Sequence, residues 1–194
     1  METKNQFMDY TKFVSLIDYL QFRDIDSGVI IINGDIRQSV VAYTLCQLRE
    51  IKRRNLPKIT MILNSFGGEL YSSFALYDAL RDLSKSGTEV TILVEGLAAS
   101  AAAMILLQAA DIRASMPSAR FLLHEIRRVA AGTESTSELK DEVTEIDKLS
   151  NMIINVLSKR CGKTKKEIKK MFERKDVWLS ANEAKDWGLI DRVI

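Results

Sequence analysis

The length and composition of the chain fit one globular domain and exclude several classes of function. The sequence has 194 residues, of which 28% are charged and 46% hydrophobic, and a chain of this length can bury a substantial core. Lys and Arg together number 28, and Asp and Glu number 26. This near balance creates no strong field that would recruit nucleic acid or an anionic membrane.

Cysteine spacing and the N-terminal sequence indicate the compartment. Cys46 and Cys161 lie far apart without a CxxC or His-rich context, so we expect no disulfide framework, no metal site and no cofactor in this chain. Met1 to Asp9 lacks the apolar stretch of a secretory signal. The weakly polar stretch Leu97 to Ala110 is shorter than the roughly 20 residues that span a bilayer. We therefore predict a cytoplasmic protein.

Strands and helices alternate through the first 110 residues. Runs of β-branched and apolar residues predict strands, and apolar positions at helical spacing predict helices. The predicted order is a strand Val29 to Ile32, a helix ended by Leu56-Pro57, a strand Ile59 to Leu63, a helix Leu70 to Leu83, a strand Val90 to Val94 closed by a Glu95-Gly96 turn, and an Ala-rich helix Ala98 to Ala110. This alternation predicts a mainly parallel α/β core.

The remaining chain contains a short strand and three helices. After a strand Phe121 to Leu123, the capping box Ser135-x-x-Glu138 opens a long helix whose single apolar face suggests that it projects from the core. A helix Thr164 to Phe172, an extended segment Asp176 to Leu179 and a helix Ala181 to Trp187 ended by Gly188 complete the chain. Gly162-Lys163-Thr164 resembles the end of a phosphate-binding loop, but Leu157 occupies the required upstream glycine position. We interpret this triplet as a helix stop followed by an N-cap.

Two segments have the residue types of an acyl-transfer site. In the loop Asn64-Ser65-Phe66-Gly67-Gly68, the glycines allow backbone N–H groups to approach a ligand and stabilise negative charge; a plain turn is the alternative. Ser100 lies between alanine pairs at a predicted helix start, where an accessible hydroxyl suits a nucleophile. An N-cap or a close-packing serine is the alternative. The GxSxG nucleophile motif is absent, since positions 98 and 102 are both Ala.

A histidine and an aspartate complete the candidate set. His124 is the only histidine in the chain, so any histidine base must be this residue, although a core histidine bonded to a backbone carbonyl is the alternative. Asp176 precedes an apolar pair, and a simple turn cap is its alternative role. Each of these signals is weak when taken alone.

Four motifs in sequence order resemble those of the Clp proteolytic subunits, over roughly Val29 to Ile194. The motifs are Asn64-Ser65-x-Gly67-Gly68, Gly96-Leu97-Ala98-Ala99-Ser100, the run from Met116 to His124, and the run from Asp176 to Asp191. The resemblance implies the superhelical ββα fold shared with crotonases, with a protruding strand-helix handle at about 125–160. Residues 1–28 match poorly and stand where the family has its axial-pore region.

The resemblance also implies an activity and an assembly. The catalytic triad would be Ser100, His124 and Asp176, and the oxyanion hole would use the N–H groups of Gly68 and Ala101. The chain would be a serine endopeptidase subunit in a barrel of two stacked heptameric rings. Peptides and unfolded proteins would be delivered by a partner AAA+ unfoldase, which uses the ATP.

The sequence departs from the family pattern at several positions, as expected of a divergent paralogue or a mobile-element version. Phe66 replaces a Pro, Ala101-Ala102 replace Met-Gly, and Glu125-Ile126 replace Gln-Pro, whereas Ile62 and Asp82 stand where aromatic unfoldase-docking residues are usual. Two other functions compete with the peptidase. They are a crotonase-type acyl-CoA enzyme and a catalytically silent ring subunit, and the presence of all three triad residues in peptidase order argues against both.

Overall fold

The computed structural model describes residues 23–127 and 135–194. The predicted N-terminal segment therefore lies outside the described residues up to residue 22, and so does part of the predicted handle. The elements are β1 (Val29–Asn33), α2 (Gln38–Arg54), β2 (Lys58–Ser65), α3 (Leu70–Lys85), β3 (Glu89–Ala99), α4 (Ala101–Met104), the 3-10 helix η2 (Leu106–Ala109), β4 (Ile112–Ser115), β5 (Arg120–Leu123), α5 (Thr136–Cys161), α6 (Lys165–Phe172), β6 (Val177–Ser180), α7 (Ala181–Trp187) and β7 (Arg192–Val193).

A forked, mainly parallel sheet forms the centre of the protein. Its strand order is β1-β2-β3-β4-β7, and all of these pairings are parallel. β3 changes partner along its length, since Thr91 to Val94 pair with β4 and Leu97 to Ala99 pair with β5. β6 then adds to β5 in antiparallel orientation. The fork brings the ends of β3, β5 and β6 together.

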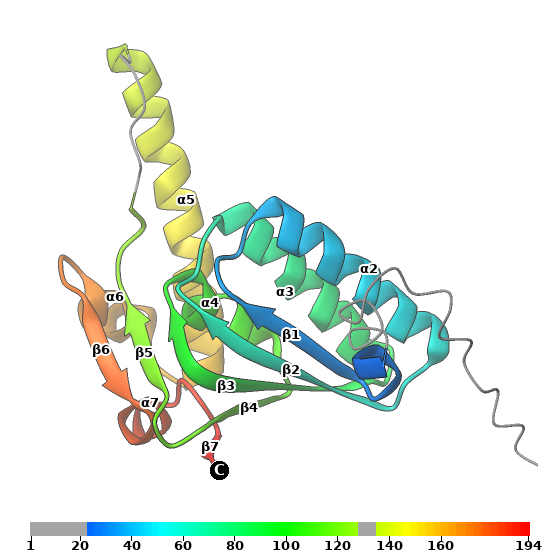
Figure 1. The fold of residues 1–194 in the computed structure, drawn as a ribbon. Helices are drawn as coiled ribbons and strands as arrows, with labels where there is room; N and C mark the ends of the chain where they lie inside the picture. The colour runs from blue at the N-terminus through cyan, green and yellow to red at the C-terminus, as the bar shows by residue number, and fades with distance from the viewer. Residues whose placement is uncertain (1–22, 128–134) are drawn as a thin grey trace, which may run out of the picture.

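Helices α2 and α3 cover one face of the sheet, as Figure 1 shows. Their inward residues, including Leu48, Ile51, Leu76 and Leu80, are at most 4% exposed and pack on the buried apolar residues of the strands. At roughly 25 cal/mol per Å² of apolar area removed from water, this two-layer core is the main source of stability. The predicted α/β class with a largely parallel sheet is confirmed.

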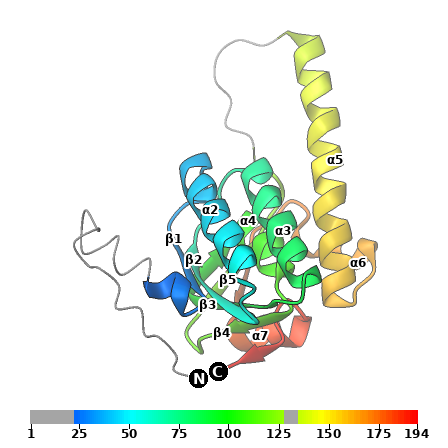
Figure 2. The same cartoon turned by 90° about the vertical axis from the view of Figure 1, so that its right-hand side faces the viewer.

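Helix α5 projects from this body (Figures 1 and 2). The predicted capping box is present: the Ser135 hydroxyl accepts from the Glu138 N–H at 3.2 Å, and the Ser135 N–H donates to the Glu138 carboxylate at 2.7 Å. Hydrogen bonding to the carboxylate, first from the Ser135 N–H and then from the Ser135 side chain, lowers the pKa of the Glu138 carboxyl. Leu149 and Leu157 are buried against the core, whereas Val143 is 57% exposed. The buried anchor of the helix thus lies in its C-terminal half, and the Tyr71 hydroxyl of α3 adds a 3.1 Å bond to the Glu145 carboxylate.

A buried polar network fixes the C-terminal segment to the body. The Arg113 side chain is 6% exposed and bonds both carboxylate oxygens of Asp191, at 2.5 and 3.1 Å. It also donates to the Gln108 side chain and the Gly188 carbonyl, at 2.8 and 2.9 Å. Gln108, itself fully buried, donates to the carbonyls of Ala103 and Leu189. The segment that follows Ser100 is therefore tied to the end of the chain.

Most predicted elements are present, but one region is wrong. β3 does not stop at a Glu95-Gly96 turn: it continues to Ala99, because its second half pairs with β5. The predicted helix Ala98 to Ala110 is only the four-residue α4 followed by η2, with Ile105 out of helical geometry between them. The short strands β4 and β7 were not predicted. In the described part of the chain, no helix has both the length and the apolarity to cross a membrane.

Candidate active site

Ser100 lies at a sharp strand-to-helix junction. It follows β3 and precedes α4, with φ 54° and ψ −128°, a conformation that a residue with a side chain rarely adopts. Its N–H donates to the Leu122 carbonyl of β5 at 2.8 Å, which fixes the junction against the neighbouring strand. Backbone strain of this kind costs on the order of 1–3 kcal/mol and is often found at functional sites. The sequence prediction that Ser100 opens a helix is confirmed.

The glycine loop packs directly against this serine. A Cβ added at Gly67 would lie 2.8 Å from the Ser100 Cβ and 2.7 Å from the Ala99 carbonyl oxygen, so only glycine fits here. The Gly67 carbonyl accepts from the Ile36 N–H, and the Glu69 N–H donates to the Ile36 carbonyl. In such a parallel bridge, the N–H of the intervening residue, Gly68, points away from Ile36. It is thereby available to a ligand.

Two polar side chains that sequence reasoning did not single out shape this loop. The Ser65 hydroxyl accepts from the Gly67 N–H at 3.0 Å, and the Asn64 side chain accepts from the Leu97 N–H at 3.1 Å. The Asn64 amide also donates to the side chain of Asn33 at 2.9 Å. Ser65 thus supports the loop from within, whereas Asn64 holds it on the neighbouring strands through partners 31 and 33 residues away in sequence, too far to be predicted.

Four of the five predicted site residues line one cavity of about 220 Å³. They are Gly68, Ser100, Ala101 and His124. The Ala101 N–H is at the first position of α4, where a helix leaves its N–H groups without intrahelical partners. The residues that carry a hydroxyl, an imidazole and two backbone N–H groups therefore line one cavity at the end of β3, and these are the groups that acyl transfer uses.

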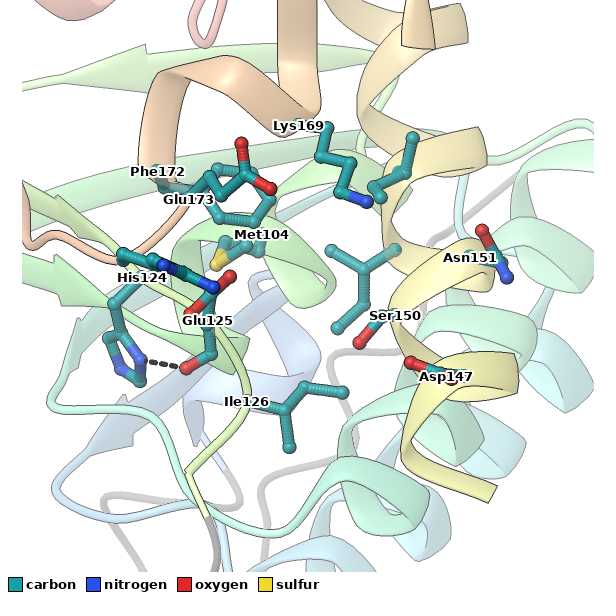
Figure 3. Close-up of a pocket in the computed structure, with 13 residues that line it drawn as sticks. Met104, His124, Glu125, Ile126, Asp147, Ser150, Asn151, Lys169, Phe172 and Glu173 are labelled. Carbon is teal, nitrogen blue, oxygen red and sulfur yellow. Dashed lines mark hydrogen bonds between the residues drawn. The ribbon is translucent and has the colours of Figure 1, made fainter. Parts of the chain in front are cut away.

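His124 is half-buried at the end of β5, and its ring is held by a backbone carbonyl. Its Nδ1 lies 2.5 Å from the Glu125 carbonyl oxygen, the contact dashed in Figure 3. A carbonyl can only accept, so Nδ1 carries the hydrogen of this contact, and in the neutral form of such a ring the lone pair is at Nε2. This tautomer is the one that can accept a proton from a serine.

Asp176 is placed opposite His124 but does not bond it. In the antiparallel β5–β6 ladder Leu123 pairs with Val177, so the next position along the register sets His124 against Asp176. Directly opposed residues have Cα atoms about 4.5–5.5 Å apart. The carboxylate of Asp176 nevertheless pairs with the guanidinium of Arg127. The register thus places His124 and Asp176 near each other, but each side chain bonds a different partner, the Glu125 carbonyl for His124 and Arg127 for Asp176.

A second cavity of about 460 Å³ adjoins the first at His124 and lies between α4, α5 and α6 (Figure 3). Its lining is mixed. Apolar side chains come from Met104, Ile126, Ile153, Ile154 and Phe172, and polar or charged ones include Asp147, Ser150, Asn151, Lys169, Glu173 and Arg174. Among residues 23–127 and 135–194, no group of His, Cys, Asp and Glu side chains has a metal-binding arrangement.

Together these features define an α/β protein with a strained strand-to-helix serine, an adjacent histidine and paired backbone N–H groups. Comparison with known proteins agrees with this class. The family model described as Clp protease matches residues 18–194. The ATP-dependent Clp protease proteolytic subunit 1 of Chlamydia muridarum (strain MoPn / Nigg) is 34% identical over 137 residues, which cover 70% of this chain and 69% of the relative. The chain belongs to the Clp protease family, and the resemblance seen in the sequence is confirmed.

Proposed function

We propose that the protein is a serine endopeptidase subunit whose triad is Ser100, His124 and Asp176. The observation that carries the proposal is the cavity at the end of β3, which Gly68, Ser100, Ala101 and His124 line together. The register that sets Asp176 opposite His124 supports the third member of the triad.

The chemistry follows from the order of these groups. Nε2 of His124 takes the proton of the Ser100 hydroxyl as the serine oxygen attacks a peptide carbonyl. The N–H groups of Gly68 and Ala101 stabilise the oxyanion of the tetrahedral intermediate, and the loss of one such donor typically costs about 3 kcal/mol. His124 then donates the proton to the leaving amine, and water hydrolyses the acyl-enzyme by the same route. Asp176 orients the ring and stabilises its charged form.

The larger cavity is the natural place for a substrate side chain. It adjoins His124 and has about 460 Å³ of space, enough for a large side chain. Its mixed apolar and polar lining suits a long side chain with an apolar stem and a polar end.

The proposal includes an assembly. Leu139 and Val143 are 41% and 57% exposed on the projecting part of α5, an apolar surface that a second ring would cover. As the resemblance implies, we expect two stacked heptameric rings in the cytoplasm, joined through this helix. A separate AAA+ unfoldase would use ATP to deliver unfolded proteins, and this chain would need no cofactor of its own.

Three assays on the purified protein separate the proposal from its alternatives. We expect hydrolysis of a short fluorogenic peptide without nucleotide, a mass of fourteen subunits by native mass spectrometry, and no hydrolysis of an acyl-CoA thioester. Thioester turnover without peptide turnover would identify a crotonase-type enzyme instead. A ring that cleaves neither substrate would identify a silent subunit.

A further inference from the structure

The ion pair between Arg127 and Asp176 occupies the carboxylate that the proposed triad requires. Arg127 follows His124 by three residues and lines the same cavity as Ser100 and His124. Its guanidinium bonds Oδ1 of Asp176, while Nδ1 of His124 bonds the Glu125 carbonyl. Two contacts thus replace the single His124–Asp176 bond.

The alternative bond requires both present contacts to break. Because Leu123 pairs with Val177 at the end of the β5–β6 ladder, His124 and Asp176 are the next residues on the two strands, and we infer that side-chain rotations bring the carboxylate to Nδ1. The side chains of Arg127 and Asp176 are 63% and 40% exposed, so water screens their attraction. Such a pair biases the position of the carboxylate without locking it.

We propose that Arg127 is a positioning residue that competes with His124 for the carboxylate of Asp176, and so lowers the fraction of molecules with an aligned triad. This inference rests on the proposed function. While the carboxylate is held by Arg127, the Glu125 carbonyl still sets the correct tautomer of His124. A neutral carbonyl stabilises the imidazolium less than a carboxylate does, so the proton transfer from Ser100 is slower in this arrangement. Contacts that draw Arg127 away would raise the activity.

The test measures the rate of Ser100 modification by a fluorophosphonate, together with the hydrolysis of a short peptide. Arg127→Gln removes the competing cation, and both rates should rise up to about fivefold, the scale set by an exposed ion pair. Arg127→Lys keeps the cation and should give less than half of that increase. Arg53→Gln removes an equally exposed arginine from its 2.7 Å pair with Glu50 on α2, and should leave both rates unchanged.

A double-mutant cycle shows whether the effect passes through the carboxylate. In an Asp176→Asn background, Arg127→Gln should no longer raise either rate, because no carboxylate remains to be released. If Asp176→Asn lowers both rates but Arg127→Gln alone leaves them unchanged or slower, the competition is refuted while the triad stands. An Asp176→Asn variant as active as the wild type would instead refute the triad. An increase that persists in the Asp176→Asn background would refute the proposed route.

Discussion

Replacing Asp191 by asparagine should destabilise the fold through the buried guanidinium of Arg113. Asp191 accepts three hydrogen bonds from Arg113, two from the guanidinium and one of 2.7 Å from the backbone N–H. Removal of one partner from a fully buried ion pair costs about 3–5 kcal/mol. Because the Asp191 side chain is 41% exposed and asparagine can still accept some of these bonds, we expect about 2 kcal/mol. For a chain of this size, that lowers Tm by about 4–8 °C.

The pH dependence of the same pair has a definite sign. Burial raises the pKa of Asp191, but the guanidinium and backbone N–H of Arg113 outweigh it, so the net pKa lies below its usual value. A carboxyl with a depressed folded-state pKa contributes stability above its unfolded value of about 4, and this is lost as pH falls through the folded value. The Tm difference between wild type and Asp191→Asn should therefore be present at pH 7 and shrink below about pH 4.

Thermal unfolding at one fixed protein concentration measures this effect, since assembly also shifts Tm. Asp186→Asn is the matched control, because Asp186 is an exposed residue of the nearby helix α7 and has no ion pair within the described ranges. The reasoning is refuted if Asp191→Asn and Asp186→Asn have the same Tm at pH 7, or if the Asp191→Asn difference grows as the pH falls.

The remaining predictions concern the site. Gly67→Ala should slow fluorophosphonate labelling at least tenfold, because the added Cβ would collide with Ser100. Gly87 has a similar positive φ but open space around it, so Gly87→Ala should destabilise the fold without slowing the labelling. Equal labelling rates in the two variants would contradict the packing argument. His124→Ala should lower peptide hydrolysis by about three orders of magnitude. Asp176→Asn should lower it by about two to three orders, because the triad is aligned in only part of the wild-type molecules. A near-normal rate in either variant would remove that residue from the triad.

Local sequence patterns predicted the elements whose signals are local. The β-branched run at Val29 to Ile32 and the capping box at Ser135 each depend on neighbours within a few residues, and both are present. The stretch Ala98 to Ala110 is not the single helix predicted for it, although alanine is the strongest helix former, because long-range contacts override the local preference. Pairing with β5 and the buried bonds of Gln108 decide its structure, and those partners are distant in sequence. Strands β4 and β7 likewise depend on long-range pairing.

The candidate site was likewise predictable only in part: its backbone positions follow from the sequence, but its side-chain contacts do not. The backbone positions of Ser100, Gly68 and His124 follow from motifs that mark element ends, and the structure places them around one cavity. The Arg127–Asp176 pair depends on two side-chain directions across β5 and β6, which no periodicity or motif encodes. The sequence therefore predicted the residues of the site, but not the contact of Arg127 with the carboxylate of Asp176.

The central claim is that Ser100 is the nucleophile, and intact mass after reaction with a fluorophosphonate tests it most directly. The reagent loses fluoride and forms a phosphonyl ester with the serine oxygen. We predict one adduct per chain, its absence in Ser100→Ala, and slow formation in His124→Ala. An adduct that forms at an undiminished rate in Ser100→Ala would contradict the account.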